Sequence, residues 1–266
     1  MARKPMMAAN WKMNKLVREA EDYVARLLPR AAAAREVDVA VFVPFTCLPA
    51  VTRIAEGSIL LAGAQNFYPK DSGAFTGEVS VPMLTDVGVT AVIVGHSERR
   101  ELFGETDEMV ARKTRRAVEA GMLPVVCVGE TKEERDAGRM WDKCSGQVRK
   151  VIEELGEANG EDLIFAYEPI WAIGTGDTAS PEDAQDAMGQ IRGLLNELVN
   201  EDFAGSVRII YGGSVKPENI GELMAQEDVD GGLVGGASLD VDTFIELVDA
   251  AQKSAEDARD RRSVIE

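Results

Sequence analysis

The chain has 266 residues, of which 45% are hydrophobic, so it can form one large domain or two small ones. Its net charge of −17 argues against nucleic acid or an anionic membrane as partner, because both attract basic patches. No apolar run approaches the ~20 residues of a membrane span. The first apolar stretch is interrupted by Asn10 and Lys12, which makes it too short for a signal peptide. We therefore expect a cytoplasmic protein with neither nucleic acid nor a membrane as partner.

The three cysteines, Cys47, Cys127 and Cys144, are widely spaced and form no C-x-x-C pair, which fits a reducing compartment. Because His96 is the only histidine, we expect no metal site. The acidic composition also means that a site for an anionic ligand must generate its positive potential locally.

Apolar runs that end in glycine, proline or polar residues alternate along the chain with segments of helical periodicity. The apolar runs predict strands at 6–9, 37–43, 59–64, 91–94, 123–128, 163–167, 207–211 and 232–234. Periodicity and capping signals predict helices at 16–28, from 48, at 106–120, after 131, at 180–198 and at 241–253.

Eight strand-then-helix units without a linker predict an α/β fold, a single (β/α)8 barrel domain over residues 1–266. Continuous apolar strands suit a parallel sheet that is covered on both faces. The alternative is a doubly wound open sheet, but no G-x-G-x-x-G motif opens the first unit. From about residue 255 we expect a short helical extension on the surface.

Polar residues and glycines follow the predicted strands at the point where each strand ends. In a closed parallel barrel these ends share one rim, where such barrels carry their active sites. The residues expected at the rim are Asn10, Lys12, Gln65, His96, Glu168, Ser214, Gly235 and Gly236. A carboxylate, an imidazole, a cation and an amide that are far apart in the sequence would therefore converge.

Glu168 ends the sixth predicted strand and precedes a short apolar loop with a proline at its start and glycines at its end. A loop of this kind suits a lid, and a carboxylate beneath a lid suits a general base that is shielded from water. The alternative is a capping glutamate before an ordinary turn. The predicted lid consists of Pro169, Ile170, Trp171, Ala172, Ile173, Gly174, Thr175 and Gly176.

Two glycine-rich segments, Gly212-Gly213-Ser214 and Gly235-Gly236, follow the last two predicted strands. Glycines let backbone N–H groups approach an anion closely, and a helix N-terminus adds partial positive charge. The loops after strands seven and eight commonly bind phosphate in such barrels. We interpret the two segments as a phosphate site, with two tight turns as the alternative.

His96 directly follows the fourth predicted strand and precedes what looks like the first turn of a helix. A helix N-terminus disfavours the imidazolium, so a neutral ring there could donate a hydrogen bond to a developing oxyanion. The alternative is a structural histidine, which is the more common role of a lone histidine. Lys12 is expected to face the ligand, with a solvated cation as the alternative.

Five segments together resemble the triosephosphate isomerase family, over about residues 3 to 253. They are A-N-W-K-M-N from Ala9, G-H-S-E-R-R from Gly95, A-Y-E-P-I-W-A-I-G-T-G from Ala166, Y-G-G-S-V from Tyr211 and L-V-G-G-A-S from Leu233. The resemblance implies a TIM barrel enzyme of glycolysis and gluconeogenesis. It would interconvert dihydroxyacetone phosphate and D-glyceraldehyde 3-phosphate through an enediolate, without a cofactor.

The resemblance also implies a role for each matched residue. Glu168 would move a proton between the two carbons, and His96 would move protons between the oxygens. Lys12 and Asn10 would stabilise the developing oxyanion, with Glu98 supporting the lysine. The N–H groups that bind the phosphate would be those of Gly174, Ser214, Gly235 and Gly236.

The segment from Phe67 to Glu78 is long for a loop within one subunit. In the family this loop inserts into a neighbouring subunit, where the residue matching Thr76 approaches the partner's Asn10. We therefore expect a homodimer. Asp177 departs from the family, which often has lysine there, so the resemblance does not extend to the kinetics of lid opening.

Two other functions are compatible with a phosphate-binding barrel. An aldolase or another phosphosugar enzyme would need a Schiff-base lysine or a different acid–base pair at the strand ends, and neither is found. A non-catalytic phosphate-binding or interaction protein would be indicated by the loss of Glu168 or His96, and both residues are present.

Overall fold

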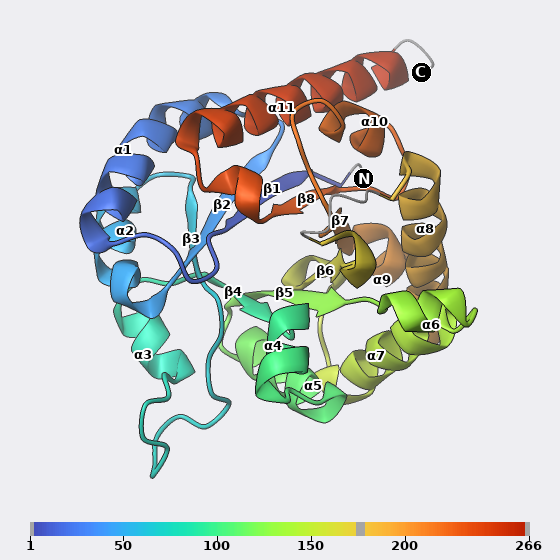
Figure 1. The fold of residues 1–266 in the computed structure, drawn as a ribbon, viewed down its shortest axis with the longest axis horizontal. Coiled ribbons are helices and arrows are strands. Elements are labelled where there is room, and N and C mark those ends of the chain that lie inside the picture. Colours follow the sequence, from blue (N-terminus) through green and yellow to red (C-terminus); the bar gives the residue numbers. More distant parts are fainter. Residues whose placement is uncertain (1–2, 174–178, 264–266) are drawn as a thin grey trace.

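The computed structural model describes residues 3–173 and 179–263, and in it eight parallel strands form a closed barrel (Figure 1). Each strand pairs with the next along the chain, and the last strand pairs back onto the first. The predicted (β/α)8 barrel is therefore confirmed. The strands are β1 (Met6–Asn10), β2 (Asp38–Val43), β3 (Leu61–Ala64), β4 (Ala91–Val94), β5 (Leu123–Val128), β6 (Ile164–Tyr167), β7 (Arg208–Tyr211) and β8 (Gly231–Val234).

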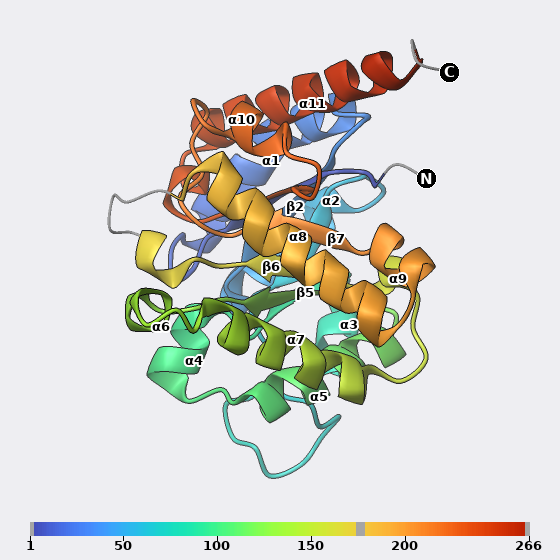
Figure 2. The same cartoon turned by 90° about the vertical axis from the view of Figure 1, so that its right-hand side faces the viewer.

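Helices surround the barrel, as the side view in Figure 2 shows. No helix in the described part of the chain is both long and apolar enough to cross a membrane. The α-helices are α1 (Val17–Ala33), α2 (Leu48–Ala55), α3 (Val81–Asp86), α4 (Ser97–Phe103), α5 (Asp107–Glu119), α6 (Lys132–Asp136), α7 (Met140–Leu155), α8 (Pro181–Leu198), α9 (Glu201–Ser206), α10 (Ile220–Met224) and α11 (Val241–Ser263). Short 3-10 turns are η1 (Phe45–Cys47), η2 (Gly160–Asp162), η3 (Ile170–Ala172) and η4 (Gly236–Ser238).

The strands contribute to two apolar layers because successive side chains point to opposite faces of a strand. One set, which includes Met6, Phe42 and Ile210, fills the barrel interior, and the other packs against the helices. Inside the barrel, the Phe42 ring occupies the space beside Gly63. A Cβ on Gly63 would lie only 2.3 Å from that ring, so the packing requires glycine at this position.

The predicted starts of two helices are confirmed by their caps. At α8, the Ser180 hydroxyl accepts a hydrogen bond from the Asp183 N–H at 3.0 Å, and the Ser180 N–H donates to the Asp183 carboxylate at 3.2 Å. At α5, the Thr106 hydroxyl accepts from the Met109 N–H at 3.3 Å. Such caps satisfy N–H groups that have no partner within the helix.

Several predicted boundaries in the first half of the chain were wrong, and the largest difference is that α1 continues to Ala33 and does not end at residue 28. The third strand begins at Leu61 and not at residue 59, because Ile59 lies in the preceding turn and is 54% exposed. Leu16 does not belong to the buried face of the first helix. It is the N-cap of α1 and is 74% exposed, so its apolar side chain points away from the core.

The last helix was expected to end at Lys253, but α11 continues without a break to Ser263. The expected extension from about residue 255 is thus the last part of α11. Two side chains of this helix contact Glu36 in the loop before β2. Gln252 accepts a hydrogen bond from the Glu36 N–H at 2.9 Å, and Arg259 pairs with the Glu36 carboxylate. These contacts fix the C-terminal part of the helix to the barrel.

Candidate active site

The C-terminal ends of the strands open into a cavity of about 370 Å³. The structure brings together at its wall the predicted residues Asn10, Lys12, His96, Glu168, Ser214, Gly235 and Gly236. Of the predicted lid, Pro169 to Ile173 are described. The remaining three predicted lid residues, Gly174, Thr175 and Gly176, lie outside the described residues, as does Asp177.

Glu168 lies directly beyond β6, where its N–H donates to the Val128 carbonyl at 2.7 Å. Its side chain is almost completely buried, and Oε2 accepts a hydrogen bond from the Ser97 N–H at 2.9 Å. The other oxygen, Oε1, lies 3.1 Å from Nε2 of His96 but outside hydrogen-bond geometry, and it has no hydrogen bond to any described residue. A buried carboxylate oxygen without a partner is suited to accept a proton.

His96 is the N-cap of α4, and its Nδ1 accepts a hydrogen bond from the Glu98 N–H at 3.2 Å. Because Nδ1 is an acceptor, the proton of the neutral ring is on Nε2, the nitrogen beside the Glu168 carboxylate. The ring lies at a helix N-terminus, as the sequence predicted, and its neutral form stays a prediction. The side chain is buried and lines the cavity.

Lys12 has a left-handed backbone conformation with φ of 52°, which is unfavourable for a residue with a side chain. Two side chains hold it there, because its N–H donates to Asn10 Oδ1 at 3.1 Å and its carbonyl accepts from Gln65 Nε2 at 2.9 Å. The same Gln65 nitrogen also donates to the Phe42 carbonyl at 3.0 Å. The half-buried Lys12 ammonium pairs with the Glu98 carboxylate at 2.7 Å.

The glycines after β7 and β8 bring backbone close to the catalytic candidates. A Cβ on Gly212 would lie 2.9 Å from Cγ of Glu168 and 3.2 Å from the Tyr167 carbonyl. A Cβ on Gly235 would lie 3.4 Å from Cε of Lys12. The glycines therefore leave space for the two charged side chains as well as for a ligand.

A second polar cluster lies beneath the start of the predicted lid, and the sequence patterns did not reveal it. Its centre is Glu130, which follows β5 and is completely buried. Glu130 Oε1 accepts hydrogen bonds from the Tyr167 hydroxyl at 3.1 Å and from the Trp171 indole N–H at 2.9 Å. Burial raises the pKa of the Glu130 carboxyl, although these hydrogen bonds lower it.

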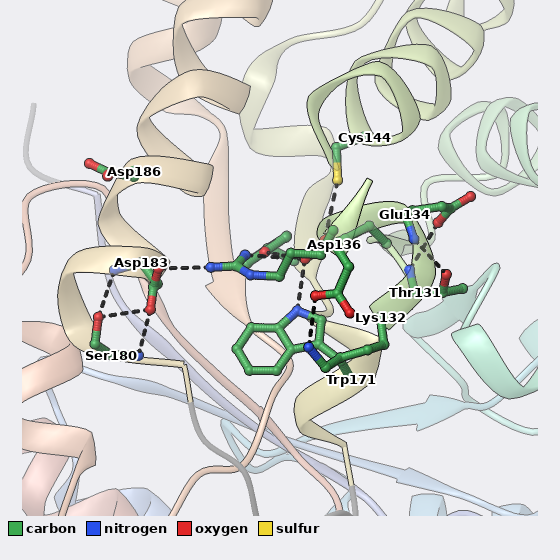
Figure 3. Close-up of polar contacts among 12 residues, drawn as sticks. Thr131, Lys132, Glu134, Asp136, Cys144, Trp171, Ser180, Asp183 and Asp186 are labelled. Atoms are coloured by element: carbon green, nitrogen blue, oxygen red, sulfur yellow. Dashed lines mark hydrogen bonds and ion pairs between the residues drawn. The ribbon is translucent and has the colours of Figure 1, made fainter. Parts of the chain in front are cut away.

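Side chains of α6, α7 and α8 also belong to this cluster, and Figure 3 shows Cys144 of α7 and Asp183 of α8 around Trp171. The Arg135 guanidinium lies 3.4 Å from Glu130 Oε1, donates to Asp183 at 2.8 Å and sits 4.6 Å from the centroid of the Trp171 ring. The Cys144 thiol donates to Glu130 Oε2 at 3.7 Å. The cluster thus fixes Trp171, the third residue of the predicted lid, by a hydrogen bond to Glu130 and a cation–π contact with Arg135.

A family model described as "Triosephosphate isomerase" matches residues 5–251 of the chain. The chain belongs to the triosephosphate isomerase family. It is 74% identical to the triosephosphate isomerase of Rubrobacter xylanophilus over 251 residues, which are 94% of this chain and 98% of that protein. It is also 52% identical to the triosephosphate isomerase of Chloroflexus aurantiacus over 244 residues, which are 92% of this chain and 98% of that protein.

A third relative, the triosephosphate isomerase of Moorella thermoacetica, is 50% identical over 250 residues, which are 94% of this chain and 100% of that protein. In the described part of the chain, no group of three or more His, Cys, Asp or Glu side chains is arranged so that it could hold a metal ion. The wall of the cavity presents a carboxylate, an imidazole, a lysine and glycine-rich backbone.

Proposed function

We propose that this chain is an intramolecular aldose–ketose isomerase that interconverts dihydroxyacetone phosphate and D-glyceraldehyde 3-phosphate through an enediolate. It would act in glycolysis and gluconeogenesis, in the cytoplasm and without a cofactor. The observation that carries the proposal is the unpartnered oxygen of buried Glu168, 3.1 Å from the His96 imidazole in a cavity lined by Lys12. Membership of the triosephosphate isomerase family supports the choice of substrate.

In the proposed mechanism, Glu168 removes a proton from one carbon of the substrate and returns it to the neighbouring carbon. The electrons move onto the carbonyl oxygen, where an enediolate oxyanion forms. His96 donates from Nε2 to that oxygen and then moves protons between the two oxygens. A neutral imidazole is suited to this exchange because it can donate a proton and recover one from the same intermediate.

Lys12 and Asn10 are proposed to stabilise the same oxyanion. The left-handed backbone of Lys12 allows Asn10 to hold its N–H while the ammonium group lies at the cavity wall. Glu98, at 2.7 Å from that ammonium, keeps it oriented before the substrate binds. Loss of one such electrostatic donor typically costs ~10²–10³ in rate.

The substrate phosphate is proposed to lie against the N–H groups of Gly174, Ser214, Gly235 and Gly236. Ser214, Gly235 and Gly236 line one side of the cavity, together with Gly212 and Gly213, whereas Gly174 lies outside the described residues. This site suits a chain of net charge −17, because backbone dipoles attract a dianion without a basic surface. The lid from Pro169 to Gly176 would then exclude water and disfavour loss of phosphate.

Glu168→Asp tests the proposed base, because it retracts the carboxylate by one methylene. We expect the wild type to turn over glyceraldehyde 3-phosphate in a coupled assay and the variant to lose about 10²-fold or more in kcat, because the oxygen no longer reaches the carbon. Glu182→Asp, at an exposed position in the first turn of α8, is the matched control and should leave kcat unchanged. A folded wild type without turnover would refute the proposed reaction.

We also propose a homodimer. Apolar side chains are strongly exposed around the β1–α1 and β4–α5 connections, namely Met13 (96%), Leu16 (74%), Leu102 (69%) and Phe103 (67%). Beside them is a cavity of about 270 Å³, lined by residues that include Asn10, Lys12, Met13, Phe45, His96 and Phe103. The segment that carries Thr76 extends away from the barrel between β3 and α3 (Figure 1), as a loop that enters a neighbour's cavity would.

Light scattering tests this assembly. We expect the mass of two chains at micromolar concentration. Thr76→Arg should shift the protein to monomers and reduce activity, because a bulky cation would have to enter a cavity already lined by Lys12. An active monomer would contradict the proposed dimer.

A further inference from the structure

Lys15 is a surface-loop lysine whose side chain turns inward. It lies between β1 and α1 with a left-handed φ of 74°, a conformation that normally favours glycine. Its side chain is half-buried, and Nζ donates a hydrogen bond to the Leu239 carbonyl at 2.7 Å. The ammonium also lies 4.7 Å from the centroid of the Tyr23 ring and 5.3 Å from that of Trp11, within the range of cation–π attraction.

Tyr23 makes a second contact to the same turn. Its hydroxyl donates to the Ser238 carbonyl at 2.7 Å, and the buried Ser238 hydroxyl donates to the Gly235 carbonyl at 2.7 Å. The Tyr23 and Trp11 rings pack edge to face, with centroids 4.8 Å apart. Tyr23 is buried, which raises the pKa of its hydroxyl, and the partial burial of Lys15 lowers the pKa of its ammonium group.

Both contacts fall on the C-terminal end of one short turn. This turn is η4 with its N-cap Gly235 and its C-cap Leu239, and its first residues line the cavity. Carbonyl groups at the end of a helical turn point away from the N–H groups at its start. A donor that fixes these carbonyls therefore also fixes the direction of the N–H groups, and a cation is the favoured donor at that end.

We propose that Lys15 is a positioning residue for phosphate, which holds η4 so that the N–H groups of Gly235 and Gly236 stay directed into the cavity. This inference rests on the proposed function, because it assigns these two glycines to the substrate phosphate. Lys15 does not touch the substrate. It acts through the Leu239 carbonyl, while Tyr23 acts in parallel through Ser238.

The proposal is tested by Lys15→Met, which keeps most of the apolar stem and removes the ammonium. Equilibrium titration with inorganic phosphate should give a dissociation constant raised about five- to tenfold, because a hydrogen bond from a charged group is lost at one of two anchors. KM for glyceraldehyde 3-phosphate should rise by a similar factor. Proton exchange of D-glyceraldehyde, which lacks the phosphate, should be unchanged. Lys15→Arg should restore phosphate binding, and Lys253→Met, at an exposed position of α11, is the matched control.

Tyr23→Phe provides an independent variant, because it removes the bond to Ser238 but keeps the ring beneath the ammonium. It should weaken phosphate binding without affecting D-glyceraldehyde. An unchanged phosphate dissociation constant in folded Lys15→Met, or equal losses with and without the substrate phosphate, would overturn the inference. A wild type that binds phosphate but does not turn over would refute the proposed reaction alone, whereas one that turns over without binding phosphate would refute the inference alone.

Discussion

Gly212→Ala should reduce catalysis by displacing the proposed base. The added methyl group would lie 2.9 Å from Cγ of Glu168, whereas carbon atoms in contact are separated by about 3.5–4.0 Å. The carboxylate therefore has to move by about 0.6–1 Å. The methyl group has little room to move, because the Tyr167 carbonyl oxygen also lies only 3.2 Å from its position.

A displacement of about 1 Å in a reacting group costs about 10²-fold in rate, or about 2.7 kcal/mol of transition-state stabilisation. We expect kcat of Gly212→Ala to fall by about that factor in the coupled assay. KM should change by less than about threefold, because the residues proposed to bind the phosphate are unaltered.

Gly193→Ala in α8 is the matched control for this substitution. No heavy atom lies within 4 Å of the position its Cβ would take, and its φ is not in the left-handed region. It should retain full activity and gain about 0.5–1 kcal/mol of stability, since alanine is the better helix former. If folded Gly212→Ala retained kcat within about threefold of the wild type, the close approach of this glycine to the base would have no catalytic consequence, and the reasoning would be refuted.

Two further substitutions test the supports of the site. Gln65→Leu removes both hydrogen bonds of the side-chain amide, so that the left-handed Lys12 loses one of its two anchors. We expect kcat/KM to fall about tenfold, or about 1.4 kcal/mol, and unchanged steady-state kinetics would contradict this. Because burial raises the pKa of Glu130, its contribution to stability is complete below its ordinary pKa and is lost as the pH rises through the folded value. Glu130→Gln cannot ionise, so its urea midpoint should improve relative to the wild type as the pH rises above about 4.3, the ordinary pKa of a glutamate. Parallel midpoint curves would exclude this effect.

The rim of the barrel was predictable because its strands are short apolar runs with clear ends. In a closed parallel barrel the C-terminal ends of all strands lie at the same rim. The topology therefore predicted that His96 and Glu168, which follow β4 and β6, lie close together. The strand starts were less certain, as the exposed Ile59 demonstrates, because an apolar residue in a turn continues the pattern of the strand.

The supporting contacts were not predictable, because they depend on residues that are distant in sequence. Glu130 precedes the cap of α6 and has the local pattern of an exposed turn residue, but its partners Tyr167 and Trp171 follow 37 and 41 residues later. Lys15 contacts a carbonyl 224 residues away. The local sequence pattern indicates which residues follow a strand and therefore lie at the rim. It contains no information on which distant side chains hold those residues in place.

The pairing of β1 with β8 has a consequence for how activity arises during synthesis. Asn10 and Lys12 leave the ribosome long before the glycines opposite them, Gly235 and Gly236. The wall of the cavity that they share exists only after the last strand has closed the barrel. A nascent chain therefore carries all of its proposed catalytic side chains, Glu168 included, before it has an enclosed site. We expect no N-terminal fragment that stops before residue 231 to isomerise a substrate.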